Sequence, residues 1–490
     1  MKNRILLAFA LLLLSLFVAN AQTNKQSENL EKLFDYCYEN EIFNGAVLIK
    51  KDGDVLLNKA YGFSDISQTN DLKTSSSFYL ASLSKQFTAF AIALLENDGK
   101  LKYDDLVRKH LPNFPYADMK ISHLLHHTSG IPDYQKLLNK QRNQLIARYE
   151  KTGKKVTNTE VANIIAKLKL PLDFEPSTNF KYSNTGYVYL ALIIEKINGL
   201  TFTEFLKNRI FLPLEMTSSG VISDKNNTSL VPAFKTNLYG KNVVNTIPNF
   251  FGVYGDGGVY SGTADLGKWD EALRNHTLLN EDKLQALFKT PTINGKESPY
   301  ALGWFVRTLP FNGSKAVTHS GVFVGYTNSM FRELNSETTS IVLSNNSHSA
   351  NAEINQAVIR ILYDVPFEFP KIPASKIISE IILTKGIQDA QDFYDEESSN
   401  NKYAFSETEM NHLGYDLIKI DKMEEAIAIF KMNVKMNPNS SNVYDSLGEA
   451  YLKSGDNEKA LKNYRTAFAK DPKNLNAERI IQELSNPKNK

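Results

Sequence analysis

The longest run of apolar positions in the interior of the chain lies within residues 78–101. From residue 86 to residue 95 nearly every side chain is apolar, which is typical of a helix buried on all sides. Gly99 follows as a residue that can end such a helix. Ser82 and Lys85 stand at its N-terminal end, three residues apart, a spacing that brings side chains together on one helical face. The pattern therefore predicts a central helix that begins at Ser82.

Other segments have the pattern of strands. Residues 44–64 hold two β-rich runs joined at Asp52-Gly53, a strong hairpin signal. Residues 135–170 are polar and helical in pattern, and they predict a cap over the core. Later strands are expected at residues 300–307, 315–318, 326–333 and 339–344, followed by a closing helix at 350–362. This order predicts an α+β fold in which distant segments complete one antiparallel sheet with flanking helices.

The C-terminal part follows a different period. The pairs Gly414 and Gly448, Ala426 and Ala460, Phe430 and Tyr464, and Pro438 and Pro472 are each separated by 34 residues. This period, with these residue types, resembles the tetratricopeptide repeat, which is an all-α unit. Residues 476–484 are expected to form a capping helix. Because fewer than three repeats rarely stand alone, helices between residues 377 and 394 are expected to complete the stack or to dock it on the first domain.

The N-terminus has the pattern of a secretory signal peptide. Residues 1–4 are basic, residues 5–18 are apolar apart from Ser15, and Ala19-Asn20-Ala21 is a small-x-small cleavage signature. We expect cleavage after Ala21 and a periplasmic or secreted bacterial protein without a membrane span. An uncleaved N-terminal anchor is the alternative.

These patterns predict four parts in a chain of 490 residues. They are a signal peptide at 1–21, an enzyme-like α+β domain at 22–370, a linker with helices at 371–402, and helical repeats with a capping helix at 403–490. The length is sufficient for two domains, each with its own core.

Composition narrows the classes of function. The formal net charge of +2 gives no electrostatic reason to expect a nucleic acid or an anionic membrane as a partner. Cys37 is the only cysteine, so no internal disulfide can form, and sites that need several thiolates are excluded. Two of the histidines His123, His126 and His127 could share a helix face as metal ligands, but the turn signal that follows favours a structural role. We expect no metal and no organic cofactor.

Ser82 and Lys85 are the strongest candidates for chemistry. A serine hydroxyl is a poor nucleophile until a base takes its proton, and a desolvated lysine can have a pKa low enough to act as that base. The N-terminal end of a helix also favours a developing negative charge. The spacing Ser-x-x-Lys occurs again at residues 399–402 and 485–488, in polar sequence without a helix of this kind. We therefore expect Ser82 to be the nucleophile.

Three motifs in order make residues 44–362 resemble the serine β-lactamase and penicillin-binding protein superfamily, specifically its class C-like esterase and peptidase branch. Ser82 and Lys85 match the Ser-x-x-Lys element of that family. Tyr182 and Asn184 match a Tyr-x-Asn loop. His319 and Gly321 match the Lys/His-x-Gly strand that lines the far wall of the cleft. The resemblance implies a β-lactamase/transpeptidase-like domain with a helical subdomain.

The resemblance also implies a role for each residue. Ser82 would attack the acyl carbon, while Lys85 and a Tyr182 of depressed pKa would share the proton transfers. Asn184 would hold the substrate amide or the lysine. His319 and Gly321 would line the substrate, and the backbone amides of Ser82 and Val322 would form the oxyanion hole.

Histidine in the third motif affects the expected substrate. His319 is largely neutral at pH 7, so it attracts a carboxylate less than the lysine of a β-lactamase would. The resemblance then favours hydrolysis of small esters or of amide bonds in D-amino-acid peptides. A D-alanyl-D-alanine carboxypeptidase and a β-lactamase are alternatives, and so is a catalytically silent protein that binds a partner through the repeats. The substrate, the partner and the oligomeric state stay open.

Overall fold

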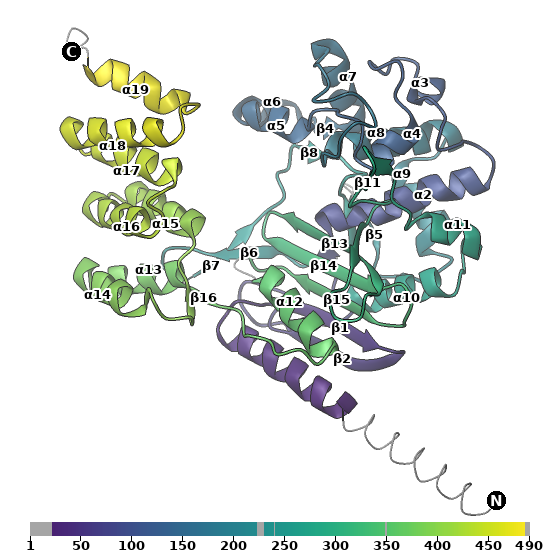
Figure 1. Ribbon diagram of the computed structural model, residues 1–490, viewed down its shortest axis with the longest axis horizontal. Coiled ribbons are helices and arrows are strands. Elements are labelled where there is room, and N and C mark those ends of the chain that lie inside the picture. Colours follow the sequence, from purple (N-terminus) through teal and green to yellow (C-terminus); the bar gives the residue numbers. More distant parts are fainter. Residues whose placement is uncertain (1–21, 223–229, 240, 348–349, 486–490) are drawn as a thin grey trace, which may run out of the picture. The chain divides into compact units, whose positions relative to one another are not determined.

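The computed structural model of the protein describes residues 22–222, 230–239, 241–347 and 350–485 (Figure 1). The expected signal peptide and its cleavage site at residues 1–21 lie outside the described residues. Contacts between residues divide the chain into two units. The first comprises Met1–Lys235 and Val244–Phe369, and the second comprises Thr236–Val243 and Pro370–Lys490. Within the described ranges, no helix has the length and apolar character needed to cross a membrane.

A six-stranded antiparallel sheet organises the first unit, in the order β12-β13-β14-β15-β1-β2. The predicted hairpin forms its far edge, and β1 pairs with β15, so segments about 300 residues apart lie side by side. The predicted α+β sheet is therefore confirmed. The strands are β1 (Gly45–Lys51), β2 (Asp54–Tyr61), β12 (Phe305–Thr308), β13 (Lys315–Phe323), β14 (Tyr326–Glu333) and β15 (Thr339–Ser344).

Two strand boundaries differ from the prediction. The strand expected at residues 300–307 begins only at Phe305, and the strand expected to end at Thr318 continues to Phe323. His319-Ser320-Gly321-Val322 therefore belongs to β13, so these residues lie on a strand, as the resemblance implied. The hydrophobic pattern stops at Thr318 because Ser320 and Val322 point to solvent, while the glycine contributes no side chain to the pattern.

Different helices cover the two faces of the sheet (Figure 1). Leu48 of β1 belongs to the cluster that includes α10 (Thr263–Arg274), whereas Val47 and Ile49 belong to a cluster with α12 (Asn351–Leu362) and the helical residues 22–39. Alternate residues of a strand point to opposite faces. A strand covered on both faces has no polar side, which explains the continuous apolar sequence at the start of β1.

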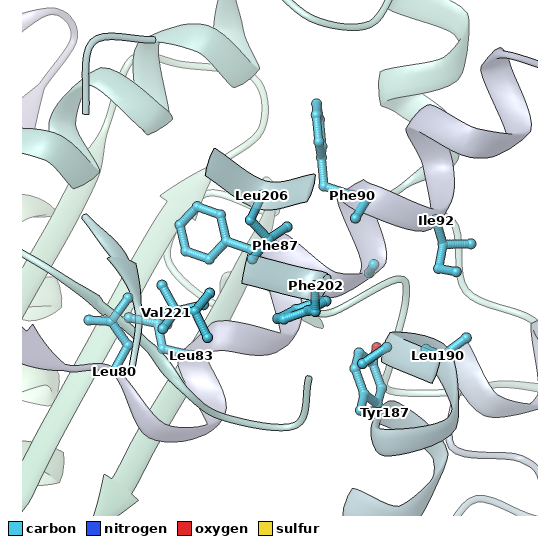
Figure 2. Packing of buried hydrophobic residues seen from close by; sticks show 14 of the residues in the cluster. Leu80, Leu83, Phe87, Phe90, Ile92, Tyr187, Leu190, Phe202, Leu206 and Val221 are labelled. Atoms are coloured by element: carbon cyan, nitrogen blue, oxygen red, sulfur yellow. The ribbon is translucent and has the colours of Figure 1, made fainter. Parts of the chain in front are cut away.

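The predicted central helix is present, with a tighter beginning than expected. A 3-10 turn at Ala81–Ser84 carries Ser82, and the α-helix α2 (Lys85–Asn97) starts at the lysine. Eleven residues of α2, from Lys85 to Leu95, are buried. Figure 2 shows Phe87 and Phe90 of this helix among Phe202, Leu206 and other core side chains. The predicted burial on all sides is confirmed.

The remaining elements of the first unit include the helical cap that was predicted for residues 135–170. The helix α8 begins directly at Asn184, and Gly199 ends it in the left-handed conformation. The helices are α3 (Val107–His110), α4 (Ile121–Leu125), α5 (Tyr134–Lys140), α6 (Arg142–Thr152), α7 (Asn158–Leu168), α8 (Asn184–Asn198), α9 (Phe202–Leu206), the π-turn η2 (Lys207–Phe211) and α11 (Glu281–Ala286). The short strands are β3 (Phe78–Tyr79), β4 (Val156–Thr157), β5 (Gly220–Val221), β8 (Phe251–Gly252), β9 (Val259–Ser261), β10 (Thr292–Ile293) and β11 (Lys296–Glu297). Two further strands, β6 (Ala233–Thr236) and β7 (Asn242–Asn245), have residues in both units.

The second unit is a stack of helix pairs with its own core. The glycines of the 34-residue period allow close helix packing, since a Cβ atom on Gly414 would lie 2.5 Å from the ring of Phe430, and one on Gly448 would lie 3.1 Å from the ring of Tyr464. Helices α13 and α14 share this core, as predicted. The elements are β16 (Ile372–Pro373), α13 (Ala374–Thr384), α14 (Ile387–Glu397), β17 (Tyr403–Ala404), α15 (Glu407–Lys419), α16 (Met423–Met436), α17 (Ser441–Lys453), α18 (Asn457–Lys470) and α19 (Leu475–Ser485).

Gly321 provides a test of how the sheet is held against the turn that carries Ser82. A Cβ atom at this position would lie 2.0 Å from the carbonyl oxygen of Leu80 and 3.0 Å from the backbone nitrogen of Leu83. Because these are backbone atoms, they cannot rotate away. We expect Gly321→Ala to lower the free energy of unfolding by about 2 kcal/mol or more, since overpacking typically costs this much.

Tryptophan fluorescence during urea unfolding of the full chain measures this effect selectively. The chain has two tryptophans, Trp269 and Trp304, and both lie in the first unit. Ser320→Ala, at the exposed neighbouring position, is the matched control and should unfold like the wild type. Equal stability of the Gly321→Ala variant would contradict the close contact.

Candidate active site

Ser82 and Lys85 are brought into contact by the turn before α2. Lys85 is fully buried, and its Nζ lies 3.1 Å from Ser82 Oγ, 2.8 Å from Asn184 Oδ1 and 2.7 Å from the carbonyl oxygen of Asp256. The residue before the serine, Ala81, has a φ angle of 49°, which is an uncommon conformation for a residue with a Cβ atom. Strained backbone of this kind is concentrated at functional sites. Ser82 and Lys85 therefore have the geometry of a nucleophile and its base.

The environment of Lys85 favours loss of its proton. Burial lowers the pKa of Lys85 to about 8, while the carboxylates of Asp256 and Asp133 act in the opposite direction. An ordinary lysine would be almost entirely protonated at neutral pH. A measurable fraction of Lys85 is thus neutral near pH 7, and a neutral amine can accept the proton of the Ser82 hydroxyl.

Tyr182 lies beside this pair, as the motif suggested, but its acidity differs from the expectation. The centre of its ring is 4.9 Å from Lys85 Nζ, and its Oη atom is buried without a hydrogen-bond partner. Burial raises the pKa of Tyr182 well above its ordinary value, although the nearby hydroxyl of Ser82 acts in the opposite direction. The expected depressed pKa is therefore wrong, because a buried phenolate would have no cationic hydrogen-bond donor. Tyr182 is a neutral phenol.

Asn184 is fixed by protein groups on both sides of its amide. Its Oδ1 accepts from Lys85, and its Nδ2 donates to Oδ2 of Asp133 at 2.9 Å. The backbone N–H of Asn184 donates to the same carboxylate oxygen at 2.9 Å, while Oδ1 of Asp133 accepts from the backbone of Gln135 at the start of α5. Asp133 therefore orients the amide that holds the lysine.

Sequence reasoning missed Asp133 as a site residue. The signal was present, since an aspartate directly before a helical segment is a typical N-cap. Asp133 also accepts a hydrogen bond from the backbone of Asn184 at the start of α8. Because the two residues are 51 positions apart, this contact cannot be inferred from local sequence.

Asp256, which stands in the glycine-rich stretch Gly255-Asp256-Gly257-Gly258, was also missed. Its carbonyl oxygen accepts from Lys85, Oδ2 accepts from the hydroxyl of Tyr134 at 3.0 Å, and Oδ1 is buried without a partner. Burial raises the pKa of this carboxyl group. Gly255 and Gly258, with φ angles of 100° and 96°, provide the tight path that brings Asp256 under the lysine.

His319 lies in the site, with both ring nitrogens engaged. Nδ1 donates to the carbonyl oxygen of Ser320 at 2.7 Å, so Nε2 must accept the hydrogen bond from the hydroxyl of Tyr300 at 2.9 Å. Burial lowers the pKa of His319 to about 3, and Lys85 contributes to the same shift. The expected neutral state is confirmed. Because the side chain is 2% exposed, it has no charge and no free nitrogen to offer a substrate carboxylate.

Gly321 and Val322 place the edge of β13 against the nucleophile. The close approach of Gly321 to Leu80 puts the strand next to the turn that carries Ser82. Strand β12 pairs only with residues 315–318 of β13, so residues 319–323 have no paired strand on that side among the described residues. The side chain of Val322 is 70% exposed. The arrangement leaves an open strand edge beside Ser82.

His126 and His127, which directly follow α4, act as packing and hydrogen-bonding residues. His126 Nδ1 donates to the carbonyl oxygen of Tyr300 at 3.1 Å, and His127 Nδ1 accepts from the backbone of Ser183 at 3.2 Å. The ring of His127 lies 4.2 Å from that of Tyr182. Within the described ranges, no group of three or more histidine, cysteine or acidic side chains could hold a metal ion.

Buried polar atoms without partners gather in this region. They include Tyr182 Oη, His127 Nε2, Ser183 Oγ and Asp256 Oδ1. Native proteins leave few such atoms unsatisfied, and a local concentration is typical of a site that receives a ligand or water. These atoms therefore support an active site at the place where Ser82 and Lys85 meet.

Comparison with known proteins gives an independent assignment. The family model described as "Beta-lactamase" matches residues 30–363, and that described as "Tetratricopeptide repeat" matches residues 441–474. Penicillin-binding protein 4* of Bacillus subtilis is 34% identical over 366 residues, which cover 71% of this chain and 79% of that protein.

Solved structures show the same fold. The octameric penicillin-binding protein homologue from Pyrococcus abyssi has a TM-score of 0.59 and 25% identity, and the match covers 71% of this chain and 80% of that one. The penicillin-binding protein from Bacillus halodurans has a TM-score of 0.57 and 26% identity, covering 68% of this chain and 99% of that one. The protein therefore belongs to the beta-lactamase family of serine hydrolases and carries a tetratricopeptide repeat in its C-terminal part.

Proposed function

We propose that the protein hydrolyses its substrate through an acyl-enzyme formed on Ser82. The observation that carries this proposal is the buried amine of Lys85, 3.1 Å from Ser82 Oγ and with a pKa lowered to about 8. A nucleophile next to a base of near-neutral pKa is the arrangement that acyl transfer requires.

In the first step, Ser82 Oγ forms a bond to the acyl carbon while its proton passes to Lys85 Nζ. The carbonyl oxygen of the substrate becomes an oxyanion, for which the backbone N–H groups of Ser82 and Val322 are the proposed donors. Tyr182, as a neutral phenol, gives its proton to the leaving oxygen or nitrogen when the bond to the acyl carbon breaks, and Lys85 returns a proton to Tyr182. In the second step, water attacks the acyl carbon and Ser82 leaves, with the proton transfers reversed.

For the substrate we propose small esters or amide bonds of D-amino-acid peptides. The neutral, hydrogen-bonded His319 supports this choice, because the site then has no ammonium group at that position for a carboxylate. The 34% identity to a penicillin-binding protein gives specific support to a second candidate, acylation by β-lactams or by the D-alanyl end of cell-wall peptides. Screening esters, D-peptides and lactams as acyl donors distinguishes the two.

We further propose that residues 1–21 export the chain to the bacterial periplasm or the medium, and that the helical repeats bind a protein or brace the enzyme. The pattern of the first 21 residues supports export. The match to a tetratricopeptide repeat supports a role in protein binding. The site residues named above all come from the first unit, which supports the proposal that the repeats take no part in the chemistry.

A fluorophosphonate probe tests the nucleophile. Incubation of the full mature chain should add one probe mass to the wild type and none to Ser82→Ala, as measured by intact-protein mass spectrometry. Ser399→Ala, in another Ser-x-x-Lys sequence, is the matched control and should be labelled like the wild type. A folded wild type without an adduct would favour the alternative of a catalytically silent binding protein.

The pH dependence tests Lys85 as the base. Since the neutral amine is the active form, kcat/KM should rise with pH and level off above a midpoint near 8. The carboxylate of Asp256 raises the pKa of Lys85, so Asp256→Asn should move this midpoint to lower pH.

Tyr134→Phe is the control for that shift, because it removes a hydrogen bond to Asp256 without changing the charge. Its midpoint should stay close to that of the wild type. A profile without a limb in this range would exclude Lys85 as the base that limits the reaction.

Substrates with different leaving groups test whether Tyr182 is the proton donor. If the phenol donates a proton to the leaving atom, Tyr182→Phe should lower kcat/KM by about two orders of magnitude for an alkyl ester or an amide. A p-nitrophenyl ester needs little protonation of its leaving group, so its loss should be much smaller. Equal losses for the two kinds of substrate, measured in the same preparation, would remove Tyr182 from this role.

A further inference from the structure

A cavity lies beside the proposed catalytic residues in the first unit. Its internal volume is about 100 Å³, with a wider mouth open to solvent. This is less than the roughly 300–1,000 Å³ of a site for a whole small molecule, so the cavity has room for one group of a substrate. Its wall is formed by α5 and the start of α6 on one side, and by residues 248–251 and the end of β13 on the other. The lining residues are Gln135, Leu138, Asn139, Arg142, Pro248, Phe250, Phe251 and Phe323.

Both walls of the cavity begin at residues that adjoin the site. Helix α5 begins at Tyr134, directly after Asp133. Asp133 contacts Asn184, and Tyr134 contacts Asp256. On the other wall, Phe323 stands two residues after Gly321, and its ring lies 5.7 Å from that of Tyr79, which precedes the turn of Ser82. A substrate held along the open edge of β13 would therefore enter this cavity beyond Val322.

The direction along β13 indicates which part of the substrate the cavity would receive. The leaving group is expected near Tyr182, the proposed proton donor, whose ring lies 6.2 Å from that of His319. Phe323 lies on the other side of Gly321 and Val322 in the strand. The cavity is thus on the side of the acyl group.

The lining combines an apolar floor with one cation. Leu138 is 7% exposed and Phe250 is 6% exposed, and the rings of Phe251 and Phe323 lie 5.5 Å apart. The guanidinium group of Arg142 is 5.8 Å from the centre of the Phe250 ring. Arg142 is exposed and forms no ion pair with any carboxylate of the described residues. Apolar surface is suited to an apolar group, and an unpaired guanidinium is suited to a carboxylate.

We propose that this cavity is the acyl-group subsite and selects substrates whose acyl part is apolar and ends in a carboxylate. The inference rests on the proposed hydrolase function and adds the substrate class. The apolar body of the acyl group packs against Leu138, Phe250 and Phe323, and its terminal carboxylate pairs with Arg142. A small acyl group such as acetyl does not reach the cavity.

The test compares three p-nitrophenyl esters with the full mature chain. One is the acetate, the second is a mono-ester of a medium-length aliphatic diacid, and the third is that diacid ester with its free carboxylate masked as a methyl ester. The wild type should prefer the free carboxylate over the masked form by at least about threefold in kcat/KM, since a partly exposed ion pair contributes this much. Added salt should reduce the preference.

Arg142→Gln should abolish the preference, bringing the ratio of the two diacid esters close to one. Lys151→Gln removes the same charge from the same helix, nine residues or about 13 Å further along, and should leave the ratio unchanged. A wild-type ratio of one, or a ratio that Arg142→Gln leaves intact, would overturn the subsite. Failure to hydrolyse even the acetate would instead count against the proposed hydrolase, so the two failures are distinct.

Discussion

The site depends on a single buried amine. Lys85 is removed from water, which is costly for an ammonium ion unless polar groups replace the solvent. Three oxygen atoms do so, and they come from the turn of Ser82, the start of α8 and the loop at Asp256. Because the amine needs all three partners, it ties together segments that are far apart in the chain. These contacts offset only part of the cost of burying the charge, so the pKa of the amine falls to about 8. The neutral amine, which is the form that a general base needs, is therefore accessible near neutral pH.

The same burial assigns different roles to two neighbouring groups. It lowers the pKa of the lysine and raises that of Tyr182, so each group is driven toward its neutral form. A neutral amine accepts a proton, and a neutral phenol donates one. The acid and the base that we propose for the site thus follow from one physical cause, and the proposal requires no ionised tyrosine.

Much of this could be predicted from local sequence. The apolar run of α2, the hairpin at Asp52-Gly53 and the 34-residue period each depend on residues that are close in sequence or regularly spaced, and all three were recovered. The full length of β13 was missed because its last residues face a cleft and solvent, where hydrophobic alternation gives no signal. The roles of Asp133 and Asp256 were missed because their partners lie 51 and 171 positions away. The acidity of Tyr182 depends on burial, which its motif does not encode.

The pairing of β1 with β15 also has a consequence for the order of events during protein synthesis. The first strand must wait for about 300 further residues before its partner exists, which takes roughly 15–60 s at about 5–20 residues per second. During that time the N-terminal hairpin has one unpaired edge, and the enzyme-like unit cannot close. The helical pairs of the second unit need only neighbouring residues, so each can form as soon as it is made. The main sheet of the first unit therefore stays incomplete until β15 has been made, well past the middle of the chain.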